Sequence, residues 1–173
     1  PDRNDMQITA SAFSSPIGGA DPFDSEGVRF NCILEFADGA GEVKLSANDP
    51  NVQPSLNYRY LELDRDVERL RESVRITVKL LEDEAFAPIV AERLQPTDDD
   101  LSTDENLDIW MRKTVFNTTH ASGTCKIGPA SDPAAVVDQR LNIHGLENIK
   151  VADASVMPNV IRANTNATTI MIG

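Results

Sequence analysis

The chain has 173 residues, of which 40% are hydrophobic and 25% are charged, and this balance predicts an ordinary globular protein with one core. Its formal net charge of -12 opposes nucleic acid and anionic membranes as partners, because such binding relies on lysine and arginine contacts with phosphates. No apolar run reaches the length that spans a bilayer, and the first residues lack the basic start and apolar centre of a signal peptide.

In the first part of the chain, the pattern predicts an antiparallel sheet. Residues 6–13 ("MQITASAF") suit a strand, and residues 28–36 ("VRFNCILEF") are rich in β-branched and aromatic side chains. The Asp-Gly turn in 37–42 ("ADGAGE") is expected to send the chain back into 43–46 ("VKLS") as a hairpin. After a loop with two prolines, residues 56–63 ("LNYRYLEL") are expected to form another strand.

Helical spacing begins at Asp64, which we expect to be the N-cap of a first helix. Apolar residues recur after it every three or four positions: Val67, Leu70, Val74, Val78 and Leu81. A second helix is predicted to begin at Ser102, which has capping-box spacing with Glu105, and to bury Leu107, Trp110 and Met111. Residues 95–102 between the helices are expected to be a solvated acidic loop.

From His120 onward, short apolar stretches are separated by Gly, Pro and Asn turns, which predicts loops and strands rather than a compact helical unit. Because the chain opens directly into "MQITASAF" and stops inside the apolar run "TTIMIG", we expect it to be a fragment. Cys32 and Cys125 have neither disulfide nor zinc spacing, so a reducing, cytoplasmic location is favoured. The two histidines are too few and too separated to predict a metal site.

His120 lies in "HASGTCKIG", a stretch otherwise poor in reactive side chains. Histidine suits proton transfer near neutral pH but is also common in structural hydrogen bonds, so the pattern alone leaves both interpretations open. The Asn-Thr-Asn run at 164–166, taken alone, favours polar caps at a helix start. The glycines of "GAGEVK" match only the first two of a dinucleotide-binding loop, and a hairpin turn accounts for them.

Three ordered blocks carry a specific resemblance: "THASGTCKIG" (119–128), "VVDQRLNIHGLENIKVADASVMP" (136–158) and "NTNATTIMIG" (164–173). Together they resemble the C-terminal signature of the glucose-methanol-choline (GMC) oxidoreductases, the flavin-dependent alcohol oxidases and dehydrogenases. Upstream, residues 41–61 look like strands of the family's substrate domain. The resemblance implies an α+β fold in which an antiparallel sheet with flanking helices binds the substrate.

The same resemblance implies a domain organisation. Residues 1–136 would be the substrate-binding domain with the loop of the catalytic histidine, and residues 137–173 would be a C-terminal strip of an FAD-binding Rossmann-like domain. The family's N-terminal half, with its glycine-rich loop for the pyrophosphate, is absent from this sequence. We therefore expect the missing FAD-binding half of the same polypeptide to be the partner of this chain, and the fragment to be inactive alone.

Catalytic roles follow from the resemblance for two residues. His120 falls on the first active-site histidine and would take the hydroxyl proton of an alcohol while the adjacent carbon gives hydride to flavin N5. Asn164 falls on the family's histidine-or-asparagine position, in the pairing that choline-oxidising members resemble, and would hold the alcohol oxygen. The expected reaction is oxidation of a small alcohol to an aldehyde or ketone, with FAD as the cofactor.

Flavin contacts are implied for four further residues: Asp153 and Ala154 near the ribityl and pyrophosphate region, and Thr165 and Asn166 near the pyrimidine end of the ring. Cys125 and His144 are interpreted as packing and structural residues. The sequence does not assign which aromatic residues line the pocket, and the default is the core for all of them: Phe13, Phe30, Tyr58, Tyr60 and Trp110.

Two alternatives stay open. A few members of the same family cleave cyanohydrins, so a flavin-containing hydroxynitrile lyase would use His120 as a base equally well. A noncatalytic binding domain that kept the family core is the other alternative, and the presence of both His120 and Asn164 speaks against it.

Overall fold

The computed structural model describes residues 4–12 and 27–173, which fall into two compact units. The first unit contains the described residues up to Leu34 together with Leu61–Val115, and the second contains Glu35–Tyr60 and Phe116–Gly173. Phe13, at the end of the predicted first strand, lies outside the described residues. Helices and two antiparallel sheets confirm the α+β class.

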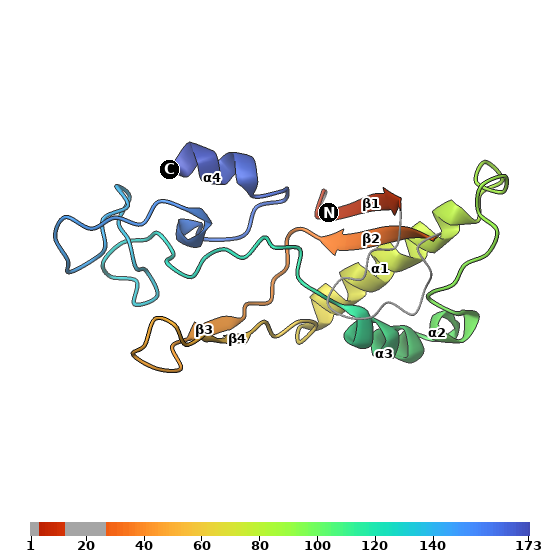
Figure 1. Cartoon of the computed structure of the whole chain (residues 1–173), viewed down its shortest axis with the longest axis horizontal. Helices are drawn as coiled ribbons and strands as arrows, with labels where there is room; N and C mark the ends of the chain where they lie inside the picture. The colour runs from red at the N-terminus through yellow and green to blue at the C-terminus, as the bar shows by residue number, and fades with distance from the viewer. Residues whose placement is uncertain (1–3, 13–26) are drawn as a thin grey trace. The chain divides into compact units, whose positions relative to one another are not determined.

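The sheet of the first unit pairs β1 (Met6–Ala12) with β2 (Val28–Leu34) in antiparallel register, with Met6 opposite Leu34 (Figure 1). The predicted hairpin between 28–36 and 43–46 is therefore wrong. The physical reason is the number of residues that can pair. All seven residues of β2 pair with residues of β1, whereas the strand at 42–44 has only three residues.

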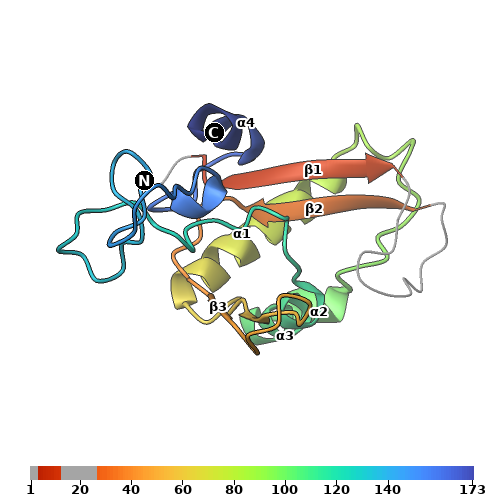
Figure 2. The ribbon, with the colours of Figure 1, turned by 60° about the vertical axis from the view of Figure 1, so that its left-hand side comes forward.

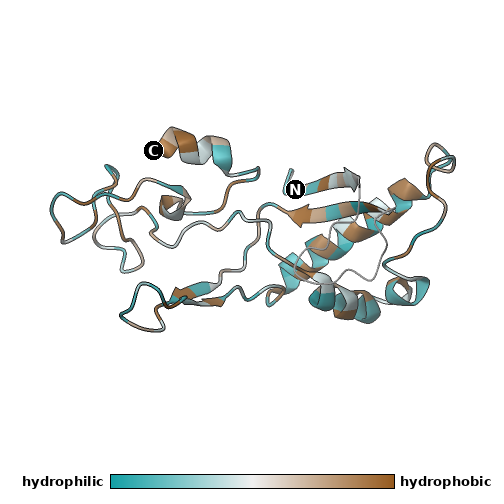
Figure 3. Ribbon diagram, in the orientation of Figure 1, coloured by the Kyte–Doolittle hydropathy of each residue, from teal (hydrophilic) through white to brown (hydrophobic). Residues whose placement is uncertain are grey.

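The core of the first unit lies between β2 and two helices, α1 (Asp64–Leu81) and α3 (Asp104–Thr114). In Figure 2 α1 runs beside the two strands, and in Figure 3 apolar and polar residues alternate along it. The buried cluster contains one residue that precedes α1 and residues of both helices: Leu61, Val67, Val74, Leu107 and Met111. The predicted apolar stripes of both helices are thus confirmed, and Trp110 packs against the same cluster.

The helix starts differ from the predictions. Leu63 is the N-cap of α1 and makes no side-chain capping bond, so Asp64 is the first helical residue rather than the cap. There its charge lies beside the positive end of the helix dipole, which stabilises the first turn without a capping hydrogen bond.

The predicted acidic loop contains a short helix, α2 (Asp98–Ser102), and this corrects the sequence analysis. A capping box forms between Thr97 and Asp100, in which the Asp100 carboxylate accepts from the Thr97 backbone N–H at 2.8 Å. The bonds from the Thr97 hydroxyl and, second, from the Thr97 N–H hold the pKa of Asp100 below its usual value. The predicted Ser102–Glu105 box is wrong, because Thr103 caps α3 by accepting from the N–H of Asn106 at 3.1 Å.

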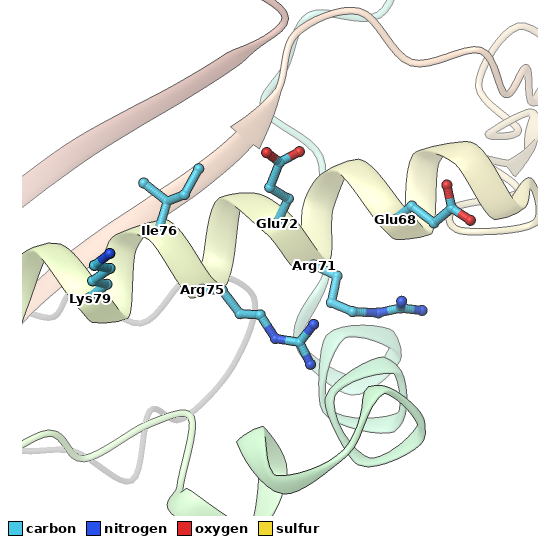
Figure 4. A pocket seen from close by; sticks show the side chains of 6 residues that line it. All are labelled: Glu68, Arg71, Glu72, Arg75, Ile76 and Lys79. Carbon is cyan, nitrogen blue, oxygen red and sulfur yellow. The ribbon is translucent and has the colours of Figure 1, made fainter.

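Arginines on one face of α1 connect it to α3. Arg71 and Arg75 both contact Asp104, each at 2.6 Å. Figure 4 shows these two side chains extending from α1 on the side opposite to Glu72 and Ile76. These arginines line a shallow hollow beside α1, and their guanidinium groups are already engaged in ion pairs with Asp104.

The second unit is built mainly from loops. Its sheet pairs β3 (Glu42–Lys44) with β4 (Ser55–Asn57), so only the first two residues of the predicted strand at 56–63 are strand residues. Gly41 precedes this pair, and a Cβ placed there would lie 2.3 Å from the Asn57 carbonyl oxygen. Only glycine permits that close approach of the two backbones.

Two short helices complete the second unit: η1 (Ala154–Val156) and α4 (Asn166–Ile172). Backbone hydrogen bonds connect η1 to the loop after His120, including Cys125 N–H to the Ser155 carbonyl at 2.8 Å and Ile127 N–H to the Val156 carbonyl at 2.9 Å. The loop-rich character predicted for the region after His120 is confirmed, but the strands predicted there are not: β pairing in these residues is limited to isolated bridges, and residues 166–172 are helical. Among the helices of the described residues, none is both long and apolar enough to cross a membrane.

Candidate functional site

His120 is held in a loop with specific turn residues on both sides. The Asn117 side-chain oxygen accepts from the backbone N–H of Thr119 at 3.0 Å, and Thr119 has a positive φ of 62°. After the histidine, Gly123 has a φ of 80°, and its N–H donates to the Ala154 carbonyl at 3.2 Å. The loop is therefore shaped by local hydrogen bonds, and the His120 side chain is 16% exposed.

Asn164 is brought to the same place from the segment before α4. Its amide nitrogen Nδ2 lies 3.4 Å from His120 Nε2. Because an amide nitrogen can only donate, Nε2 is the acceptor in this contact, and the proton of a neutral ring belongs on Nδ1. Asn164 itself is an exposed residue, so the pair is accessible from solvent.

Glu35 faces the other nitrogen of the ring. Its Oε2 lies 3.4 Å from His120 Nδ1, and its side chain is 4% exposed. The contact meets the distance of an ion pair but not hydrogen-bond geometry, and within the described residues Glu35 Oε1 and His120 Nδ1 have no hydrogen-bond partner. Glu35 was not among the functional residues predicted from the sequence. The available signal was a lone carboxylate inside the apolar stretch "NCILEF".

A cation–π contact joins the segments that carry Glu35 and Asn164. The Arg162 guanidinium lies 4.7 Å from the centre of the Phe36 ring. Phe36 directly follows Glu35, and Arg162 precedes Asn164 by two positions. Three segments far apart in sequence therefore meet within the second unit around one imidazole.

The residues predicted to approach the flavin lie on η1 and at the start of α4. Asp153 is the N-cap of η1, and its carboxylate accepts from the Ser155 hydroxyl and from the Ser155 N–H at 2.8 Å. These two bonds, the hydroxyl first, hold the pKa of Asp153 below its ordinary value. Ala154 opens η1. Its carbonyl accepts from Gly123, which places η1 beside the loop of His120.

Thr165 and Asn166 stand where α4 begins. Thr165 is buried at 7% exposure, and its carbonyl accepts from both the N–H and the hydroxyl of Thr169, at 2.9 and 2.8 Å. Asn166 is exposed and is the first helical residue. The helix start predicted from the Asn-Thr-Asn run is confirmed, although Thr165 makes no side-chain capping bond.

His144, Tyr58 and Tyr60 make contacts within the protein that are typical of structural residues. His144 Nε2 lies 3.0 Å from the Gly128 carbonyl oxygen, as expected for a structural histidine. Tyr58 and Tyr60 stack on each other with ring centres 5.0 Å apart and are both exposed, so the expectation that they belong to the core is wrong. Within the described residues, no group of three or more His, Cys, Asp or Glu side chains could hold a metal ion.

Residues 37–173 match the family profile described as GMC oxidoreductase. The chain belongs to the GMC oxidoreductase family. This confirms the resemblance drawn from the sequence, and it agrees with the predicted cofactor, because GMC oxidoreductases are FAD-dependent.

Curated relatives of this GMC oxidoreductase chain include choline dehydrogenases. This chain is 39% identical over 132 residues to an oxygen-dependent choline dehydrogenase of Proteus mirabilis. The match covers 76% of this chain and 23% of that protein. It is 36% identical over 154 residues to the mitochondrial choline dehydrogenase of Mus musculus, covering 89% of this chain and 26% of that protein. The chain thus spans about a quarter of the length of these relatives.

Solved structures share the fold. A pyridoxine 4-oxidase from Mesorbium loti superposes with a TM-score of 0.83 at 23% identity, covering 97% of this chain and 32% of that one. A formate oxidase of Aspergillus oryzae, studied for modification of its FAD, gives a TM-score of 0.76 at 25% identity, covering 90% of this chain and 27% of that one. The α+β fold predicted from the sequence is therefore that of known family members.

Proposed function

We propose that this chain is the C-terminal portion of an FAD-dependent enzyme that oxidises an alcohol to an aldehyde or ketone, with His120 as the base. The observation that carries the proposal is the 3.4 Å approach of Asn164 Nδ2 to His120 Nε2. Family membership supports the reaction class, and the relatives that are choline dehydrogenases support an alcohol as the substrate.

The pair offers an alcohol two complementary contacts. A hydroxyl placed between the two side chains would replace their direct contact, donating to the lone pair of His120 Nε2 and accepting from Asn164 Nδ2. As the hydroxyl proton moves to Nε2, the oxygen gains negative charge, and the hydrogen bond from Asn164 strengthens. His120 therefore acts as the proton acceptor, and Asn164 stabilises the oxygen that loses the proton.

The residues on η1 and α4 suit a flavin. The first backbone N–H groups of α4 have no partners within the helix, so they are donors that match the carbonyl oxygens of the flavin pyrimidine ring. The exposed carboxylate of Asp153 is an acceptor that matches ribityl hydroxyls. We propose that Asp153, Ala154, Thr165 and Asn166 contact the cofactor. FAD, when bound, supplies the hydride-accepting chemistry that no side chain provides.

We propose that residues 1–136 bind the substrate and that residues 137–173 complete an FAD-binding domain. This sequence has no glycine-rich pyrophosphate loop, and the chain spans about a quarter of its relatives. The remainder of a longer polypeptide would therefore hold the adenosine end of FAD. Choline is the first alcohol to test, because it is the substrate named for the relatives and its positive charge suits a chain of net charge -12.

The test uses the full-length protein that carries this chain. Choline and a panel of primary alcohols are added anaerobically, and the flavin absorbance is followed. We expect an alcohol to bleach the flavin, and His120→Ala to slow bleaching by roughly 10²- to 10⁴-fold, the usual contribution of a general base. His144→Ala, the other histidine of the chain, should bleach at the rate of the unmodified protein.

Two results would contradict the proposal. If the protein binds flavin but no alcohol bleaches it, alcohol oxidation fails, and release of cyanide from a cyanohydrin would identify the lyase instead. If His120→Ala bleaches as fast as the unmodified protein, His120 is not the base.

A further inference from the structure

We infer that Glu35 is a positioning residue for His120: its carboxylate holds the Nδ1–H proton, so that Nε2 keeps the lone pair that takes the substrate proton. Its catalytic consequence rests on the function proposed above, whereas its effect on the ring can be measured without turnover. Neither the sequence motifs nor the family signature pointed to this residue, which lies outside the three blocks at 119–128, 136–158 and 164–173.

Both neighbours of the ring require the same tautomer. Asn164 Nδ2 is a donor 3.4 Å from Nε2, so Nε2 must accept. Glu35 Oε2 can only accept and lies 3.4 Å from Nδ1, so the carboxylate favours a proton on Nδ1. Protonation on Nε2 instead would place donor against donor at Asn164 and a lone pair against the carboxylate at Glu35, and a ring turned over would place C–H groups at both positions.

Because Glu35 is buried, its carboxylate has few groups other than His120 with which it can interact. The side chain is 4% exposed, and within the described residues neither Glu35 Oε1 nor His120 Nδ1 has a hydrogen-bond partner. A buried carboxylate without a hydrogen-bond partner is costly, and His120 Nδ1, 3.4 Å from Oε2, can provide one. An ordinary charge-assisted N–H to carboxylate bond measures about 2.7–2.9 Å, so a movement of roughly half an ångström would let His120 Nδ1–H donate to Glu35 Oε2.

Catalytic hydrogen bonds are often long in unliganded structures and tighten when the substrate binds. The local structure supports such a tightening. Phe36 anchors the backbone next to Glu35 through its contact with Arg162, and Arg162 lies two residues before Asn164. The contact between Phe36 and Arg162 therefore connects the segment that carries the Glu35 carboxylate to the segment that carries the Asn164 amide.

The charge of Glu35 also has a place in the reaction. When Nε2 accepts the hydroxyl proton, the imidazole becomes a cation with donors on both nitrogens. The Glu35 carboxylate faces that positive charge from the Nδ1 side. Loss of the carboxylate would thus leave the long contact with Asn164 alone to select the tautomer and would remove the counter-charge for the protonated state.

The first test is spectroscopic and uses the full-length holoenzyme with ¹⁵N-labelled histidine. The His120 signals, assigned with His120→Ala, are expected to show a protonated Nδ1 and a lone pair on Nε2. In Glu35→Leu, we expect a mixture of tautomers or the reverse one. An unchanged tautomer in Glu35→Leu would overturn the inference, whether or not any alcohol is oxidised.

The second test is kinetic. We expect Glu35→Gln, which keeps the shape and removes the charge, to lower kcat at least about 10-fold and by no more than the roughly 10²- to 10⁴-fold that the base itself supplies. KM should stay within about 3-fold, because Glu35 touches the ring and not the substrate. Glu35→Asp, which restores a carboxylate, should recover part of the loss. Glu42→Gln is the matched control and should retain full kcat, because Glu42 is a half-exposed glutamate of the same unit that pairs with Lys44 and not with His120.

The decisive comparison is the double variant. If Glu35 acts through His120, then Glu35→Gln added to His120→Ala should cost nothing more. Additive losses would show that Glu35 acts only on the fold, and an undiminished kcat in Glu35→Gln would also overturn the inference. If the unmodified holoenzyme oxidises no alcohol, the proposed function fails, and the tautomer measurement alone decides the role of Glu35. Flavin content and melting temperature verify that each variant folds.

Discussion

Arg71 and Asp108 form a two-point ion pair between α1 and α3, in which Nε donates to Oδ1 at 3.0 Å and a terminal nitrogen donates to Oδ2 at 3.0 Å. The Asp108 hydrogen bond raises the pKa of Arg71 above its usual value. Lysine cannot reproduce this paired geometry, because its ammonium is a single point of contact. The relationship gives the first prediction.

We expect Arg71→Lys to lower the free energy of unfolding of this chain by about 1 kcal/mol, a value reduced for partial exposure. Urea unfolding followed by the fluorescence of Trp110, the one tryptophan of the chain, measures it. Arg75→Lys is the control, because Arg75 is 45% exposed and contacts Asp104 at one point. Equal losses in the two variants would contradict a special role for the paired geometry.

The second prediction concerns the core. Leu107 is 0% exposed at the centre of the cluster between α1 and α3, so Leu107→Ala should cost about 2–5 kcal/mol by leaving a cavity. Ile109 on the same helix is 52% exposed, and Ile109→Ala should change stability by no more than about 0.5 kcal/mol. The same urea experiment compares them, and a small loss for Leu107→Ala would mean that the cluster is not the core.

Asn164 gives the third prediction. Its amide is proposed to stabilise the alcohol oxygen as it becomes negative, so Asn164→Ala in the holoenzyme should lower kcat by roughly 10²- to 10³-fold. Single-turnover flavin reduction measures the chemical step directly. Asn159→Ala, an exposed asparagine upstream in the same segment, should react like the unmodified enzyme. A change confined to KM would assign Asn164 to binding alone.

The fourth prediction concerns pH. The Ser155 hydroxyl and N–H lower the pKa of Asp153, so Ser155→Ala, which removes the hydroxyl, should move that pKa back toward its ordinary value. A carboxyl ¹³C titration measures the shift. Because the folded pKa is depressed, the stability that this group contributes is present above its unfolded pKa and is lost as the pH falls through the folded one. No shift in Ser155→Ala would contradict the assigned cause.

The fifth prediction separates the two free cysteines. Burial raises the pKa of the Cys32 thiol, and the Thr77 hydroxyl, 3.1 Å from its sulfur, partly opposes this. The reactive thiolate of Cys32 therefore forms at higher pH, and Thr77→Val should slow its labelling further. Thiol labelling of Cys32 across pH 7–10, in a Cys125→Ser background, tests this. Since the folded pKa is raised, the stability from this thiol is present below its unfolded pKa and declines as the pH rises.

Local sequence patterns predicted the helices well, because the apolar spacing that identifies a helix is contained within a few consecutive turns of that helix. The spacing from Val67 to Val78 placed α1 on the core without reference to any other segment. The capping errors had a local cause too, since Thr97, Ser102 and Thr103 compete as caps within seven positions and only hydrogen-bond geometry separates them. The sequence therefore specified which segments are helical better than where each one begins.

Pairings between distant segments could not be predicted in this way. Strand β2 has candidate partners on both sides in sequence, and turn residues at 37–42 favoured the wrong one. His120 and Asn164 were brought together only by the family signature, and Glu35 had no signal beyond one carboxylate in an apolar stretch. Glu35 lies near the His120 imidazole because of the way the loops fold in three dimensions, and the periodicity of a sequence carries no information about loop conformation.

The division of the chain into two units also sets an order of events during translation. The second unit is made from two stretches, and the segment Leu61–Val115 of the first unit lies between them. Glu35 leaves the ribosome early, but His120 and Asn164 follow only after α1 and α3 have been synthesised. The helical core can therefore close first, whereas the imidazole and both of its neighbours come together only near the end of this chain.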